Sequence, residues 1–177
     1  PLNKKDIQTF VDNAKKLKKA VTLAGINKMG CNFEDEGLKE YFTVAGQHVH
    51  VLDEFNDFMK EEIYQMMVAT TEDQNELILE NTTTLKVARW WDKACDIISC
   101  NGGKDIGIQK ILDYFNFNKE EAMAFGDGGN DISMLKYVGT GVAMGNAKDD
   151  VKAIADYITD SVQEDGIVSA LKHFDIL

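Results

Sequence analysis

The chain has 177 residues, of which 44% are hydrophobic and 28% are charged, and its net charge at pH 7 is -11. This length allows one or two domains with a substantial apolar core. No run reaches the roughly 18 apolar residues that a membrane helix needs. The negative charge argues against nucleic-acid binding, because contacts with phosphates need clustered lysine and arginine.

The cysteines and the first residues bear on the compartment. Cys31, Cys95 and Cys100 are odd in number and lack the paired spacing of a zinc site. The N-terminal stretch has no signal-peptide pattern. We therefore expect reduced thiols in a cytoplasmic protein with no membrane partner.

The first 100 residues mix helical and strand-like patterns. Hydrophobic spacing and capping residues predict helices at 4–19, about 34–45, 53–60 and about 72–80. Apolar and β-branched runs predict strands at 21–24, 29–33, 48–52, 63–70, 83–91 and 95–100. This pattern indicates a mixed α/β layer with hairpins at both ends.

After residue 100, helix and strand patterns alternate strictly, as a parallel sheet requires. Residues 122–131 read AMAFGDGGND, in which an apolar strand breaks into an acidic glycine turn before a helix. Ligands of open α/β sheets bind at the carboxyl ends of the strands. Asp127 would then be an oxygen ligand for Mg²⁺, with Asn130 and Asp131 hydrogen-bonding around it. The alternative is that these residues only form the turn and cap the helix.

Lys104 follows two glycines and lies in the first turn of a predicted helix. A lysine at this position opposes the helix dipole, but it suits a phosphate held there. The alternative is a solvated surface charge.

Four segments occur in this order along the second part of the chain: Lys104, GDGGND, GVAMGNA and ADYITDSVQEDGI. This order resembles the C-terminal half of haloacid dehalogenase-like (HAD) phosphatases of the Cof type. The resemblance implies an α/β fold, in which an α/β cap domain is inserted into a Rossmannoid parallel sheet. It also implies Mg²⁺-dependent hydrolysis of small phosphorylated metabolites, with sugar phosphates favoured.

The resemblance also implies roles for individual residues. Lys104 would steady the aspartyl nucleophile and the transferring phosphoryl group, and Asp127 would be a Mg²⁺ ligand. Asn130 resembles a phosphate-binding position, and Asp131 resembles an outer-shell position of the metal site. Asn146, in the GNA turn, resembles a position beside the phosphate.

One part of the family pattern is absent. Members begin with a strand that ends in Asp-x-Asp-Gly-Thr, where the first Asp attacks phosphorus, and this motif does not occur here. The first residues instead carry a helix-start signature that resembles the opening helix of the cap. We therefore interpret 1–100 as the cap and 101–177 as the C-terminal half of the core, without the N-terminal core segment. We expect this chain alone to be inactive and to associate with that segment or with itself.

Within the cap, Arg89 and Trp90 are candidates for substrate contact, since arginine can clamp phosphate and tryptophan can stack on sugars. The alternative is a hydrophobic cluster between cap and core. Two alternative functions remain open for the whole chain: a non-catalytic binding fragment, and a dinucleotide-binding module suggested by Gly139, Gly141 and Gly145. The second requires Gly or Ala where Met144 stands, and it requires the glycines to follow a strand.

Overall fold

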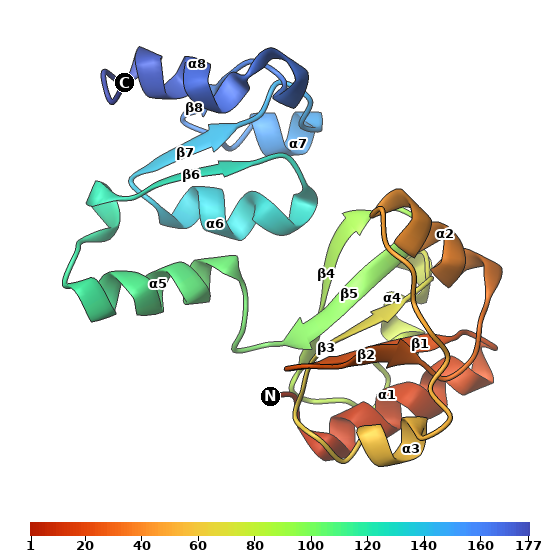
Figure 1. Ribbon diagram of the computed structural model, residues 1–177. Coiled ribbons are helices and arrows are strands. Elements are labelled where there is room, and N and C mark those ends of the chain that lie inside the picture. Colours follow the sequence, from red (N-terminus) through yellow and green to blue (C-terminus); the bar gives the residue numbers. More distant parts are fainter. The chain divides into compact units, whose positions relative to one another are not determined.

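The computed structural model describes all 177 residues, and they form two compact units, Pro1–Asn101 and Gly102–Leu177 (Figure 1). The border lies beside the one placed near residue 100 from sequence. Each unit has its own sheet, and the first unit has two apolar clusters and the second has one. None of the helices is long and apolar enough to cross a membrane.

The first unit is built on a five-stranded antiparallel sheet with the order β2-β1-β3-β5-β4. The strands are β1 (Val21–Gly25), β2 (Met29–Cys31), β3 (Ile63–Val68), β4 (Leu85–Trp91) and β5 (Ala94–Ser99). The helices are α1 (Lys4–Lys16), α2 (Glu36–Val44), α3 (Phe55–Phe58) and α4 (Asn75–Ile78), the last preceded by the 3-10 turn η1 (Glu72–Gln74). The hairpins expected at both ends, β1–β2 and β4–β5, are present.

One predicted strand of this unit does not form. Residues 48–52 make only a single parallel bridge, between Val51 and Cys31. The amide of Cys31 donates to His50 O and its carbonyl accepts from Leu52 N, both at 2.9 Å. Because β2 is only three residues long, it offers no further ladder to this segment. The strand prediction at 48–52 is therefore wrong.

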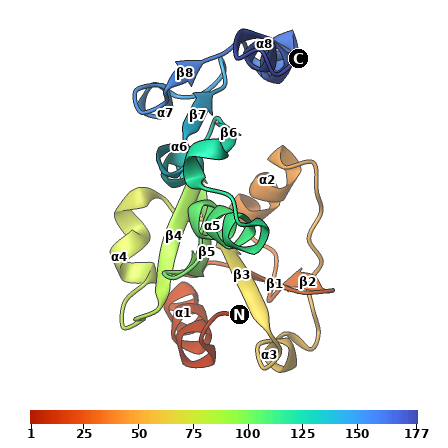
Figure 2. The ribbon, with the colours of Figure 1, turned by 90° about the vertical axis from the view of Figure 1, so that its left-hand side faces the viewer.

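The helices cover the two faces of this sheet separately (Figure 2). Apolar side chains of α1 recur at helical spacing, and Ile7, Phe10 and Ala14 are buried against one face together with residues of α3 and α4. Leu38 and Phe42 of α2 are buried against the other face.

The second unit alternates helices and strands around a three-stranded parallel sheet with the order β6-β7-β8, which confirms the parallel sheet expected from sequence. The strands are β6 (Met123–Gly126), β7 (Thr140–Ala143) and β8 (Tyr157–Ile158). The helices are α5 (Lys104–Phe115), α6 (Ile132–Tyr137), α7 (Asp149–Lys152) and α8 (Gly166–His173). Three 3-10 turns complete it: η2 (Lys119–Glu121), η3 (Gly129–Asp131) and η4 (Val162–Glu164).

Helix α5 has no buried residue, although its sequence is apolar on one side. Tyr114 is 82% exposed, Phe115 is 61% exposed, and Ile111 is also exposed. Strand β6 lies at an edge of its sheet and pairs only with β7. This unit therefore carries an aromatic helix face and a strand edge that no other part of it covers.

Asp6 joins α1 to the segment that leads into β4. Its buried carboxylate accepts hydrogen bonds from Thr83 N at 3.1 Å, from Thr84 N at 2.7 Å and from Thr84 Oγ1 at 2.6 Å. Burial by itself raises the pKa of Asp6, but these hydrogen bonds outweigh it and the pKa is lowered. The ionised carboxylate therefore stabilises the folded unit.

We expect Asp6→Ala to lower the free energy of unfolding of the first unit by roughly 1–3 kcal/mol at pH 7, because buried donors lose their acceptor. Since the pKa is lowered on folding, this contribution is present above the ordinary pKa of 3.8 and is lost as the pH falls through the folded value. Urea unfolding at pH 7 and near pH 3 measures both effects. Asp12→Ala, at an exposed position of the same helix, is the control and should change stability little; an equal loss in both variants would contradict the prediction.

Candidate active site

The carboxyl ends of β6 and β7 meet at one edge of the parallel sheet. Gly126 and Ala143 are paired in register, and Met144 N donates to Gly126 O at 2.9 Å just beyond the strands. Asp127 directly follows β6, and Asn146 lies in the turn after β7. Polar residues that are distant in sequence are thus placed together where ligands of such sheets bind.

The carboxylate of Asp131 is the centre of this edge. Asp131 is only 5% exposed, and its Oδ2 accepts from Asp127 N at 3.0 Å and from Gly128 N at 3.1 Å. Its Oδ1 accepts from Lys104 Nζ. Both oxygens are therefore engaged, one in closing the glycine turn and the other in holding the lysine.

Lys104 reaches Asp131 from the first turn of α5. The preceding Gly103 has φ 148°, a conformation that favours glycine, and it starts the helix without a side-chain cap. The Lys104 side chain remains 50% exposed, so its ammonium group keeps access to solvent beside the ion pair. A charge at this position can attract an anion from solvent.

Asp127 is exposed and is oriented from the neighbouring strand. Its Oδ2 accepts from Asn146 Nδ2 at 2.9 Å, and its Oδ1 accepts no hydrogen bond within the chain. Asn146 is held in turn, since its Oδ1 accepts from Val162 N at 3.1 Å. Asn130 lies in η3 between the two acidic residues and is half-buried, and its side chain makes no hydrogen bond within the chain.

The sequence reasoning assigned no role to the turn that supports Asn146. Ser161 and Glu164 form a capping box, in which Ser161 Oγ donates to Glu164 Oε2 at 2.7 Å. This box fixes η4 and with it the amide of Val162. The S-x-x-E spacing was the signal that could have shown it.

Arg89 and Trp90 belong to the first unit, and so the structure does not unite them with these five residues. The Arg89 guanidinium donates to the carbonyls of Thr70 and Ala94 and to the side chain of Asn75, at 2.7 Å, 3.0 Å and 2.8 Å. These hydrogen bonds engage the Arg89 guanidinium within the first unit. Phosphate binding by Arg89 stays a prediction that this geometry does not favour.

The metal-binding capacity of the chain is limited. Mg²⁺ prefers about six oxygen ligands in octahedral arrangement. The chain contains no group of three or more His, Cys, Asp or Glu side chains that could hold a metal ion. Asp131 has both oxygens engaged, whereas Asp127 has one oxygen without a hydrogen bond. These residues therefore fit one carboxylate ligand of a Mg²⁺ site, and the other ligands would have to come from elsewhere.

Gly139 and Gly141, which suggested a dinucleotide-binding module, have a structural role. Gly139 precedes β7 and Gly141 lies within it, so neither follows the carboxyl end of the strand. A Cβ at Gly139 would lie 2.5 Å from backbone atoms of Glu120, and one at Gly141 would lie 2.3 Å from Leu135 O. Close backbone packing explains these two glycines, and the geometry gives no support to dinucleotide binding.

A family model for haloacid dehalogenase-like hydrolases matches residues 1–171. The chain belongs to this family. It is 38% identical over 147 residues to the putative phosphatase YkrA of Bacillus subtilis, which covers 76% of this chain and 56% of that protein. It is 32% identical over 151 residues to the 5-amino-6-(5-phospho-D-ribitylamino)uracil phosphatase YitU of Bacillus subtilis, with 81% of this chain and 55% of that protein covered.

Among solved structures, the chain is similar to the HAD subclass IIB sugar phosphatase BT4131, with a TM-score of 0.90 and 33% identity. The match covers 99% of this chain and 68% of that chain. The resemblance to Cof-type HAD phosphatases is thereby confirmed, as is the HAD-like α/β fold. The chain spans just over half the length of the two curated relatives named above.

We expect Asp131→Ala to destabilise the second unit by roughly 1–3 kcal/mol, because two amides of the turn and the Lys104 ammonium lose their common acceptor. Hydrogen exchange of the Asp127 and Gly128 amides should accelerate at the same time. Urea unfolding and amide exchange measure the two effects. Asp113→Ala removes an exposed carboxylate of α5 and should leave both unchanged; protected turn amides in Asp131→Ala would contradict this account.

Proposed function

We propose that this chain is the cap and the C-terminal half of the core of a Mg²⁺-dependent phosphatase in the cytoplasm. Its substrates would be small phosphorylated metabolites, with sugar phosphates favoured. Hydrolysis would pass through an aspartyl-phosphate whose aspartate lies in an N-terminal core segment outside these 177 residues. The match covers 56% of YkrA and 68% of BT4131, which supports a longer parent protein, and BT4131 is a sugar phosphatase, which supports the substrate class.

One observation carries the proposal. At the carboxyl edge of the sheet, the buried Asp131 carboxylate binds both the half-exposed Lys104 ammonium and the backbone amide of Asp127, whose own exposed carboxylate is held by Asn146. The pair combines a positive group for phosphoryl oxygens with an oxygen ligand for a cation. A site of phosphoryl transfer needs both, because the reaction is catalysed mainly by positioning and by neutralising charge.

Each residue would then act in a defined way. The Lys104 ammonium would bind oxygens of the phosphoryl group and stabilise the charge that they carry during transfer. Asp131 would keep this ammonium in place, and Asn146 would keep the Asp127 carboxylate turned toward the site. The Asn130 amide would donate to a phosphoryl oxygen. A bound Mg²⁺ would neutralise phosphoryl charge, with Asp127 among its ligands.

The nucleophile would be an aspartate supplied by the N-terminal core segment. Its carboxylate would attack phosphorus in line with the leaving alcohol, and water would then hydrolyse the acyl phosphate. The uncovered edge of β6 and the aromatic face of α5 are the surfaces that this segment would cover. A non-catalytic role is the alternative for the isolated chain, because it contains no Asp-x-Asp-Gly-Thr motif.

In the parent protein, we expect Lys104→Ala and Asp127→Ala each to lower phosphatase turnover by about 10² or more, as the loss of a charge-stabilising group typically does. Steady-state hydrolysis of a phosphate ester, with Mg²⁺ varied, measures the effect. Lys110→Ala, at an exposed position of α5, is the matched control and should retain activity. Full activity in Lys104→Ala or in Asp127→Ala would remove that residue from the mechanism.

We expect the 177-residue chain alone to show no phosphatase turnover and to self-associate or unfold readily, because its strand edge and aromatic helix face recruit other chains. Size-exclusion chromatography with light scattering measures the mass of the particle. Adding the N-terminal core segment as a separate polypeptide should restore a defined one-to-one complex. An active, monomeric 177-residue chain would contradict both the missing nucleophile and the fragment interpretation.

A further inference from the structure

An irregularity in β4 sets the direction of two neighbouring tryptophans. Ala88 pairs with Asp96 and Trp91 pairs with Ala94, so β4 uses three steps where β5 uses two. Successive side chains of a regular strand point to opposite faces. The extra residue forms a bulge, and Trp90 and Trp91 both pack partly against the cluster on the α2 face of the sheet.

The two indole rings are nearly parallel. Their planes differ by 23° and their centroids are 6.2 Å apart, which is an offset arrangement. Tyr41 of α2 lies next to both, with centroids at 5.2 Å from Trp90 and 6.5 Å from Trp91. Both tryptophans are only half-buried, so the pair presents aromatic surface to solvent.

Tyr41 also fixes the edge of the Trp90 ring. The phenol is 5% exposed, donates to Asp96 Oδ1 at 2.6 Å and accepts from Trp90 Nε1 at 3.3 Å. Burial and the bond to Asp96 raise the pKa of Tyr41 far above its usual range, so the phenol keeps its proton. The Trp90 ring is therefore held at its polar edge as well as by packing.

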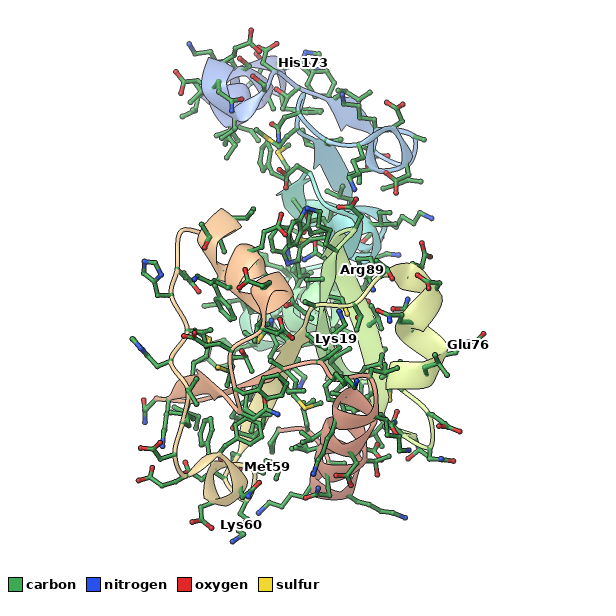
Figure 3. All side chains as sticks on the ribbon, turned by 90° about the vertical axis from the view of Figure 1, so that its right-hand side faces the viewer. Lys19, Met59, Lys60, Glu76, Arg89 and His173 are labelled. Atoms are coloured by element: carbon green, nitrogen blue, oxygen red, sulfur yellow. The ribbon has the colours of Figure 1, made fainter.

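Arg89, the only arginine of the chain and labelled in Figure 3, lies in β4 beside the bulge. Its Nη1 donates to the carbonyls of Thr70, Ala94 and Trp91, the last at 3.3 Å, and its Nη2 donates to Asn75 Oδ1. These hydrogen bonds connect the ends of β3, β4 and β5 and the η1–α4 segment around the bulge. A lysine has no planar fork and could not reproduce it.

We propose that Trp90 and Trp91 form a stacking platform for the ring of a cyclic sugar phosphate, and that Arg89 is a positioning residue that sets the platform. The polar rim supports a sugar as the ring that stacks. The Lys93 ammonium lies over the Trp91 ring, 5.4 Å from its centroid, and pairs with Glu40 at 2.7 Å, so an exposed ion pair that a sugar hydroxyl can engage borders the aromatic surface. The choice of a phosphate ester as ligand rests on the proposed function.

The chain offers a direct probe, because Trp90 and Trp91 are its only tryptophans. In a complex of the ¹⁵N-labelled chain with the unlabelled N-terminal core segment, the two indole N–H signals of a ¹⁵N–¹H correlation spectrum report on the platform alone. We expect glucose 6-phosphate to shift both signals in a saturable way. Glycerol 3-phosphate, which carries the same phosphate without a ring, should shift them at least fivefold less at equal concentration.

Variants separate stacking from packing. Trp90→Ala and Trp91→Ala should each weaken glucose 6-phosphate binding by at least fivefold, as measured on the remaining indole signal. Tyr64→Ala, which removes an exposed aromatic side chain of β3, is the control and should bind as the wild type does. Arg89→Lys should shift both indole signals without ligand and reduce the preference for the cyclic ester, while circular dichroism shows a folded chain.

The proposal would be overturned by indole signals unmoved by glucose 6-phosphate, by equal responses to the cyclic and acyclic esters, by unchanged binding of the cyclic ester in Trp90→Ala, or by an unchanged preference in a folded Arg89→Lys variant. Different outcomes would contradict the proposed function and the stacking platform. If the parent protein hydrolyses no phosphate ester while the ring still shifts the indole signals, the platform stands and the activity does not. If Trp90→Ala binds the cyclic ester unchanged in an active parent protein, the activity stands and the platform does not.

Discussion

The candidate site depends on one buried carboxylate that serves two purposes. Asp131 closes the glycine turn after β6 through two backbone amides and holds the Lys104 ammonium with its other oxygen. Burying a carboxylate is costly unless all its acceptor sites are used, and here both oxygens are. The fold of the turn and the position of the lysine therefore depend on the same group. An arrangement of this kind keeps a positive charge in place before any ligand arrives.

The sequence predicted this edge well because its signals are local. A strand, a glycine turn with acidic residues and a following helix place Asp127, Asn130 and Asp131 together whatever surrounds them. The position of Asn146 depended on β7 lying beside β6 in parallel, which strict alternation of elements predicts. The sequence did not predict how Asp127 and Asp131 differ in their hydrogen bonds. The GDGGND motif does not show that both oxygens of Asp131 accept hydrogen bonds, whereas one oxygen of Asp127 accepts none within the chain.

The first unit was harder to predict, because its features depend on contacts distant in sequence. The run at 48–52 carries two β-branched valines, as strands often do, but its neighbour β2 is too short to form a ladder with it. The contacts of Arg89 could not be predicted for the same reason. Its partners are main-chain carbonyls that lie around a bulge, and no spacing of residue types in the sequence indicates them. The chemistry of the arginine side chain suggested a phosphate ligand, but in the fold the Arg89 guanidinium binds carbonyl groups of its own unit.

The distribution of aromatic residues has a consequence for studying how the two units unfold. Both tryptophans lie in the first unit, and the second unit contains tyrosine and phenylalanine but no tryptophan. Indole fluorescence therefore follows the loss of structure in the first unit alone, whereas far-ultraviolet circular dichroism follows both. Coincident denaturation curves from the two signals would mean one cooperative transition, and separated curves would mean that each unit melts on its own.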